Sequence, residues 1–241
     1  MVNETTPAAT AVIFPTLWSG PWLWRNQQDI LAAAASRVVE IPDAVVNWPI
    51  EPTLQAAEAY ALEAVDALPG PLLLVGASLG GLLALRIALL RPLIVGAVIA
   101  SGCPGLGQGP TFGLRGKFSL TFEEACSMRS MLFEDTSCLD DELLRSSVAA
   151  VANRPAARRG AGLVRGLNEY DGVADLSRLR VPTTLIWGER DQLSPLGPWR
   201  DLVRQCQAMH LRVIPGAGHV PMLEVPEAFN AVLRSVLTPN A

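Results

Sequence analysis

The chain has 241 residues, of which 50% are hydrophobic and 17% are charged. This length suits one large α/β domain with an insertion, and the hydrophobic content predicts a substantial buried core. The formal net charge is -4, and no run of five like charges occurs, so nucleic acid is not expected as a partner. Lys117 is the single lysine and is followed by Phe118, which excludes a Walker-type phosphate loop.

Targeting and cysteine patterns favour a cytoplasmic protein. The first ten residues are polar, with neither a basic nor an apolar region of a secretory signal. The apolar region 72–100 is interrupted by Ser78, two arginines and a proline, so strands and a helix are expected there instead of a membrane span. The cysteines form no C-x-x-C pair and are expected to be reduced thiols. They are Cys103, Cys126, Cys138 and Cys206.

The first half of the chain alternates between predicted buried strands and predicted helices. Strands are expected at 11–14, 37–41, 71–75 and 93–100, and helices at 26–36, 54–68 and 82–88. Thr53 is expected to be the N-cap of the helix at 54–68. Continuous apolar strands that alternate with helices are typical of a parallel α/β sheet.

The pattern changes after Ser101, where a loop rich in glycine and proline begins. Helices alone are predicted in the following stretch, at 122–133, 140–153 and 156–168. Strand and helix then alternate again, at 181–187, 198–208, 211–214 and 227–237. We therefore expect a sheet of about six mostly parallel strands. Residues 1–104 and 179–241 would form its α/β core, and residues 105–178 a helical lid insertion.

Ser78 stands in a strand–turn–helix context, inside the pattern G-x-S-x-G. Small neighbours are needed there because the backbone turns sharply. Such a turn presents the serine hydroxyl at the top of the sheet. The N–H of Leu79, at the positive end of the following helix, can stabilise a developing oxyanion. The stretch therefore predicts a nucleophile elbow.

Two further reactive residues follow later strands. Asp191 comes after the predicted strand 181–187, and His219 comes after the predicted strand 211–214. The carboxyl ends of parallel strands meet at one edge of the sheet, where catalytic groups collect. His210, the other histidine, is expected just before a strand, at the opposite, amino-terminal ends of the strands. The two histidines show no metal-ligand spacing, so no metal and no cofactor are expected.

With these motifs, the chain resembles the α/β-hydrolase superfamily, especially its small esterases with a helical lid. The resemblance covers nearly the whole chain and rests on residues 76–81 (GASLGG), 187–191 (WGERD) and 218–221 (GHVP), with Glu224 and Pro226. It implies that Ser78 is the nucleophile, His219 the base and Asp191 the acid.

The chain departs from that pattern in two loops. The first central strand of the family usually ends in His-Gly, whereas this chain has Pro15 and Thr16. The residue after that pair normally donates the second oxyanion N–H, which would be Leu17 here. The loop after the second strand commonly carries G-x-G-x-S, whereas residues 44–48 are Ala-Val-Val-Asn-Trp.

The sequence therefore predicts a serine hydrolase that cleaves a carboxylic ester or thioester of a small hydrophobic acyl substrate. Pocket residues are expected to be Trp18, Trp48, Met131 and Val220. One alternative keeps the triad but catalyses C–C cleavage, acyl transfer or cyclisation, and a second is a non-catalytic small-molecule receptor. A monomer or homodimer is expected.

Overall fold

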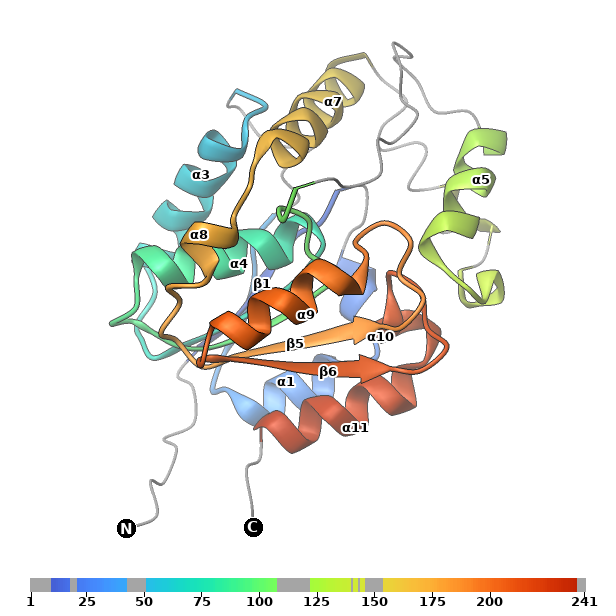
Figure 1. Ribbon diagram of the computed structural model, residues 1–241. Coiled ribbons are helices and arrows are strands. Elements are labelled where there is room, and N and C mark those ends of the chain that lie inside the picture. Colours follow the sequence, from blue (N-terminus) through green and yellow to red (C-terminus); the bar gives the residue numbers. More distant parts are fainter. Residues whose placement is uncertain are drawn as a thin grey trace.

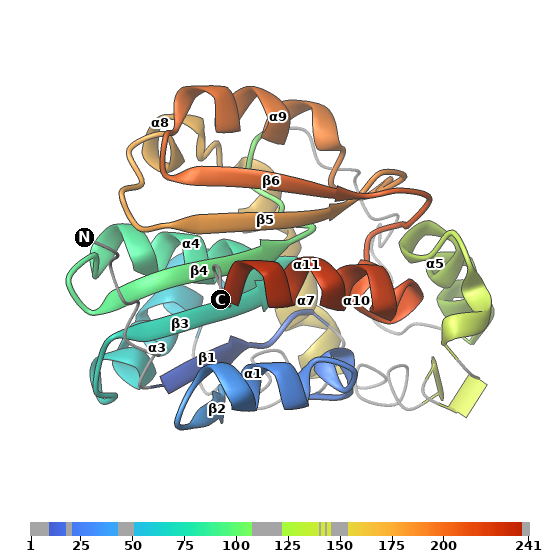
Figure 2. The same cartoon turned by 90° about the horizontal axis from the view of Figure 1, so that it is seen from below.

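The computed structural model describes residues 10–17, 21–42, 51–107, 122–139, 141–142, 144–145 and 154–237. Their centre is a six-stranded sheet with the strand order β2-β1-β3-β4-β5-β6 (Figures 1 and 2). Every neighbouring pair runs parallel. This confirms the predicted fold class. The strands are β1 (Thr10–Phe14), β2 (Val38–Glu40), β3 (Leu72–Ala77), β4 (Val95–Ser101), β5 (Thr183–Gly188) and β6 (Met209–Ile214).

Helices cover both faces of the sheet. Successive strand residues point to opposite sides, and in this sheet both sides carry apolar side chains. Leu72 and Leu74 belong to the hydrophobic cluster on one face, while Leu73 and Val75 belong to the cluster on the other. The first cluster lies under α3 (Leu54–Asp66), α4 (Leu79–Leu90), α8 (Val173–Leu176) and α9 (Leu196–Gln205). The second lies under α1 (Gln28–Ala34), α10 (Pro221–Glu224) and α11 (Pro226–Leu237), as Figure 2 shows.

The burial of each strand agrees with its position in the sheet. All residues of β3 and β5 are buried, as continuous apolar runs require in the middle of a parallel sheet. The edge strands β2 and β6 are only partly buried. The predicted cap of α3 is confirmed, since the Thr53 side chain accepts a hydrogen bond from the backbone N–H of Ala56 at 3.1 Å.

The observed elements differ from the predicted ones at the last strand and at two short helices. The last strand begins at Met209, so His210 lies within β6 instead of before it, and its side chain is exposed on the edge strand. The helices α8 and α10 were not predicted, because four residues are too few to show a helical period.

The predicted insertion contains α5 (Phe122–Leu132), the short η2 (Thr136–Cys138) and α7 (Arg154–Glu169). Both views place α5 beyond the carboxyl ends of β5 and β6 (Figures 1 and 2). The helix predicted at 140–153 lies mostly outside the described residues. The two ends of the insertion are held together at its base, where Gly172 donates its N–H to the carbonyl of Gly105 at 2.7 Å.

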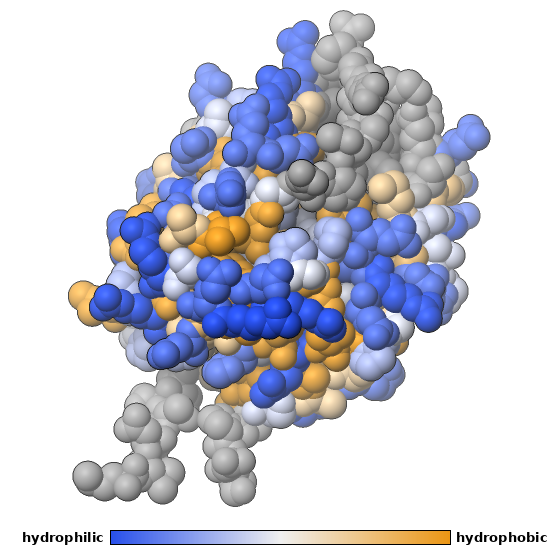
Figure 3. All heavy atoms as spheres, viewed as in Figure 1, coloured by the Kyte–Doolittle hydropathy of each residue, from blue (hydrophilic) through white to orange (hydrophobic). Residues whose placement is uncertain are grey.

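The face seen in Figure 1 carries mainly polar side chains, with small apolar areas between them (Figure 3). The most apolar helix, α4, is largely buried against the sheet. Among the described helices, none combines the length and the apolar character needed to span a bilayer.

Candidate active site

Ser78 forms a strained turn between β3 and α4. Its φ of 51° and ψ of -125° make it the one non-glycine residue with positive φ in the described part of the chain. A Cβ on Gly76 would lie 2.3 Å from the carbonyl oxygen of Gly80, and a Cβ on Gly80 would lie 2.5 Å from that of Pro15. Both glycines of G-x-S-x-G are therefore needed for close backbone contact.

The expected oxyanion donors lie at two adjoining strand ends. Leu79 is the first residue of α4, so its N–H is among those that have no partner within the helix. Leu17 lies in the turn after β1, the strand that pairs with β3. The contact between Gly80 and Pro15 brings this turn against the first turn of α4.

A turn after β5 holds the Asp191 carboxylate in place. Its Oδ1 accepts hydrogen bonds from the backbone N–H groups of Leu193 and Ser194, each at 2.9 Å. Trp187 donates its Nε1–H to the carbonyl of Ser194 at 2.9 Å, which fixes the turn to β5. The Asp191 side chain is fully buried. Its carboxylate is therefore held in one orientation.

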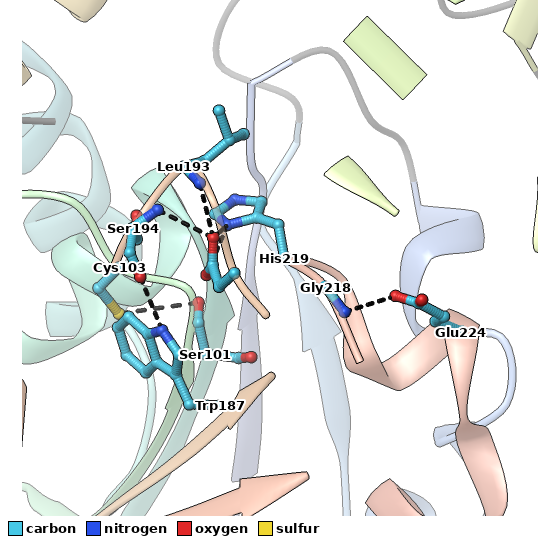
Figure 4. A network of polar contacts seen from close by, with 9 residues as sticks. Ser101, Cys103, Trp187, Leu193, Ser194, Gly218, His219 and Glu224 are labelled. Atoms are coloured by element: carbon cyan, nitrogen blue, oxygen red, sulfur yellow. Dashed lines mark hydrogen bonds and ion pairs between the residues drawn. The ribbon is translucent and has the colours of Figure 1, made fainter. Parts of the chain in front are cut away.

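His219 contacts this carboxylate directly. Its Nδ1 lies 3.0 Å from Oδ1 and 2.9 Å from Oδ2 of Asp191, and its side chain is 6% exposed. Figure 4 shows the imidazole between the Leu193–Ser194 turn and Gly218. An acceptor at Nδ1 favours the tautomer with the proton on that nitrogen, which leaves Nε2 able to take up a proton.

The corner after β4 joins the serine to the histidine. The N–H of Ser78 donates to the carbonyl of Ser101 at 2.8 Å. The next residue, Gly102, has a φ of 58°, and a Cβ on it would lie 2.8 Å from Cε1 of His219. The structure thus brings Asp191 and His219 into contact, and it places Ser78 and His219 against the same dipeptide.

The expected pocket residues fall into two groups. Val220 is buried next to His219, and Met131 lies on α5 with 38% of its surface exposed. Trp18 and Trp48 lie outside the described residues. Within the described part of the chain, no three histidine, cysteine or acidic side chains gather in a way that could hold a metal ion.

Sequence reasoning missed the supporting contacts of the site. Leu193, Ser194 and Gly102 were not singled out, although each touches a triad candidate. Glu224 was noted only as part of the family resemblance, yet it hydrogen-bonds the residue before His219. A glycine directly after a strand was the one available signal for Gly102.

Gly188, at the end of β5, allows the acid and histidine loops to touch. A Cβ there would lie 1.8 Å from the carbonyl oxygen of Gly218 and 2.5 Å from that of Ala217. Since backbone must move, we expect Gly188→Ala to destabilise the fold by about 3 kcal/mol. This corresponds to a fall of roughly 10 °C in the unfolding midpoint for a domain of this size, measurable by calorimetry.

Gly197→Ala is the matched control for that substitution. Gly197 lies in α9, and a Cβ on it would meet no atom of the described residues within 4 Å. Alanine is the better helix former by roughly 0.5–1 kcal/mol, so this variant should be slightly more stable than the wild type. Equal midpoints for the two variants would show that the close approach at Gly188 is not a constraint on the fold.

Cys103 lies near the site but is not expected to act as a nucleophile. Burial, together with the negative charge of Asp191, raises the pKa of the Cys103 thiol well above its usual range. A raised thiol pKa means that thiolate is scarce below it, so native Cys103 should resist iodoacetamide throughout pH 7–9. Mass spectrometry should find it alkylated only in denaturant, and after the half-buried Cys126. Equal rates for the two thiols in the native protein would contradict this prediction.

Comparison with known proteins agrees with this fold. A model of the Alpha/beta hydrolase family matches residues 11–232. A 2-hydroxy-6-oxo-6-phenylhexa-2,4-dienoate hydrolase of Burkholderia cepacia is 31% identical over 176 residues, or 68% of this chain and 62% of the relative. The aligned part therefore spans less than two thirds of that relative's length.

Two other similar proteins extend the comparison. A pimeloyl-(acyl-carrier protein) methyl ester esterase of Edwardsiella ictaluri is 33% identical over 181 residues, covering 68% of this chain and 69% of the relative. The crystal structure of a serine hydrolase involved in carbazole degradation has a TM-score of 0.79, with 19% identity, and covers 96% of this chain and 91% of that chain. With its parallel sheet, its strained serine turn and a family match over most of its length, the chain belongs to the alpha/beta hydrolase family.

Proposed function

We propose that this chain is a serine hydrolase that cleaves a carboxylic ester or thioester of a small hydrophobic molecule. The observation that carries the proposal is the buried pair of His219 Nδ1 and the Asp191 carboxylate at 2.9 Å, beside the strained turn of Ser78. A serine hydroxyl is a weak nucleophile until an adjacent imidazole accepts its proton, and this arrangement supplies that base.

In the proposed reaction, Ser78 Oγ attacks the acyl carbon while His219 Nε2 takes the hydroxyl proton. The carboxylate of Asp191 stabilises the imidazolium that forms. The imidazolium then protonates the departing alcohol or thiol, which leaves an acyl group on Ser78. Water, deprotonated by His219, attacks this acyl-enzyme and releases the carboxylic acid together with the free serine.

The negative charge on the substrate oxygen needs donors that face it in the transition state. We propose the backbone N–H groups of Leu79 and Leu17 for this role. Support comes from the position of Leu79 at the start of α4 and from the contact that brings the turn after β1 against it. Preorganised donors of this kind are worth about 10²–10³ in kcat each.

The ester substrate is supported by the similarity to the methyl ester esterase of Edwardsiella ictaluri. The predicted pocket residue Val220 adds an apolar side chain beside His219. We also propose Met131 as a residue of this pocket. It lies on α5, which is beyond the carboxyl ends of β5 and β6 (Figure 1).

A second candidate is hydrolysis of a carbon–carbon bond beside a ketone. The similarity to the Burkholderia cepacia hydrolase supports it, because that protein's substrate name contains a ketone and a carboxylate but no ester. The same serine, histidine and aspartate would serve, since a ketone carbonyl can be attacked in the same way. The two candidates differ in the leaving group, which is a carbanion equivalent in one and an alkoxide or thiolate in the other.

A fluorophosphonate probe combined with a panel of p-nitrophenyl esters tests the proposal. We expect the probe to modify the native protein once, on the peptide that contains Ser78, and to leave heat-denatured protein unlabelled. Turnover of short to medium acyl esters should fall to zero in parallel with labelling. Labelling without ester turnover would favour the carbon–carbon candidate, and a native protein unlabelled at Ser78 would reject both.

A further inference from the structure

The carboxylate of Glu224 joins two separate segments of backbone. Its Oε2 accepts the N–H of Gly218 at 2.8 Å, and its Oε1 accepts the N–H of Asp135 at 2.7 Å. Gly218 directly precedes His219, whereas Asp135 follows the end of α5. Figure 4 shows the Glu224 side chain directed at Gly218. Hydrogen bonds to a charged acceptor are about twice as strong as neutral ones.

The histidine loop also caps α5 directly. The N–H of His219 donates to the carbonyl of Leu132, the last residue of α5, at 2.8 Å. Carbonyls at a helix end lack partners within the helix, so this bond satisfies one of them. A Cβ on Gly218 would lie 2.8 Å from the same carbonyl oxygen and 3.0 Å from the backbone nitrogen of Glu134. Only glycine allows this approach.

The contacts of Glu224 and Leu132 hold the backbone of His219, which is one partner of the Asp191–His219 pair in the proposed mechanism. The Asp191 carboxylate is already held by the Leu193 and Ser194 N–H groups on its own loop. Among the described residues, the imidazole of His219 makes no equivalent bond to its own loop, so its direction depends on the backbone at residues 218 and 219. That backbone is held by Glu224 on one side and by Leu132 on the other.

We propose that Glu224 is a positioning residue, which fixes the backbone before His219 to the end of α5 and so keeps the imidazole aligned with Asp191. The inference rests on the proposed function, because it assigns the alignment of the base to Glu224. It also makes the segment after α5 part of the support of the site. A shift of the base by about 1 Å can lower a rate by about 10²-fold.

Three variants test the role: Glu224→Ala, Glu224→Gln and Glu227→Gln. Alanine removes both hydrogen bonds. Glutamine keeps the length of the side chain, but its NH₂ group must face one of the two N–H donors, so one bond is lost. Glu227, an exposed residue in the first turn of α11, gives a control with the same change of charge.

Ester turnover and the second-order rate of fluorophosphonate labelling are measured per folded molecule, well below the unfolding midpoint of the least stable variant. For Glu224→Ala we expect kcat and the labelling rate to fall together by about 10- to 100-fold, with KM within threefold. Glu224→Gln should lie between alanine and wild type, and Glu227→Gln should equal the wild type. A wild-type labelling rate in Glu224→Ala, or an equal loss in Glu227→Gln, would overturn the inference.

The proton on Nδ1 of His219, observed by NMR, gives a readout that does not depend on turnover. In Glu224→Ala this proton should exchange with water faster than in the wild type, because the bond to Asp191 is less well held. Unchanged exchange would overturn the positioning role. If the wild-type protein carries no label at Ser78, the proposed function fails, and the exchange rate of this proton still decides the role of Glu224.

Discussion

Ser78→Ala is expected to lower kcat for the best p-nitrophenyl ester by about 10⁶-fold. The variant keeps the Asp191–His219 pair and the backbone N–H groups of the elbow but has no hydroxyl to form an acyl-enzyme. Alanine is tolerated sterically, although the φ of 51° remains strained for any residue with a Cβ. Stopped-flow assays measure the wild-type rate, and assays over long times measure the residual rate of the variant. Titration with the fluorophosphonate probe counts the active sites of the wild type and detects any wild-type contamination of the variant.

Ser101→Ala is the matched control for the loss of a hydroxyl. Ser101 is fully buried, and its Oγ is without a hydrogen-bond partner among the described residues. The Ser78 N–H binds the Ser101 carbonyl, which alanine keeps. We therefore expect kcat within about threefold of the wild type, since removing an unpaired hydroxyl costs little. If the Ser101 variant lost activity and the Ser78 variant did not, the nucleophile would be wrongly assigned.

The parallel direction of the strands could be predicted because each central strand is a continuous apolar run, whereas their order in the sheet was not predicted. Leu72–Ala77 and Thr183–Gly188 can be buried on both faces only inside a parallel sheet covered by helices. Edge positions were less clear from the sequence. The apolar positions of β6 are spaced by exposed ones, so its start at Met209 was placed two residues too late.

The candidate site was predictable where a residue type and a strand end coincide. Ser78, Asp191 and His219 each follow a strand, and the chemistry of each side chain is specific. The supporting contacts are different in kind. The Leu193 and Ser194 N–H groups are backbone donors, which every residue but proline offers, so the sequence cannot distinguish them. Glu224 is one acidic residue among many until the fold brings Asp135 to it.

The contacts of the glycines also could not be predicted from the sequence. A glycine in a strand or loop indicates a turn or a close approach but does not identify the partner. Gly188 ends β5 and Gly218 lies in the loop after β6, and the structure alone shows that the Cα of one faces the carbonyl of the other. Contacts between distant segments of the chain are therefore what the structure adds to the sequence.

Asp191→Asn is expected to lower kcat by about 10⁴-fold while the fold is retained. The asparagine carbonyl can still accept the N–H groups of Leu193 and Ser194 through the position of Oδ1. Its NH₂ group then takes the position of Oδ2, 2.9 Å from Nδ1 of His219, and favours the tautomer in which Nδ1 is an acceptor, in competition with the amide oxygen 3.0 Å from the same nitrogen. The remaining proton moves to Nε2, so the imidazole cannot take the proton of Ser78.

The stability of the Asp191 variants distinguishes the roles of the carboxylate more sharply than loss of activity alone. The unfolding midpoint of Asp191→Asn should stay within a few degrees of the wild type, because the turn keeps its acceptor. Asp191→Ala, in contrast, leaves two buried N–H groups unpaired, at about 1–3 kcal/mol each, and should be clearly less stable. Similar kcat values with different stabilities would separate the chemical role of the carboxylate from its structural one. Turnover of Asp191→Asn within tenfold of the wild type would show that another group orients His219.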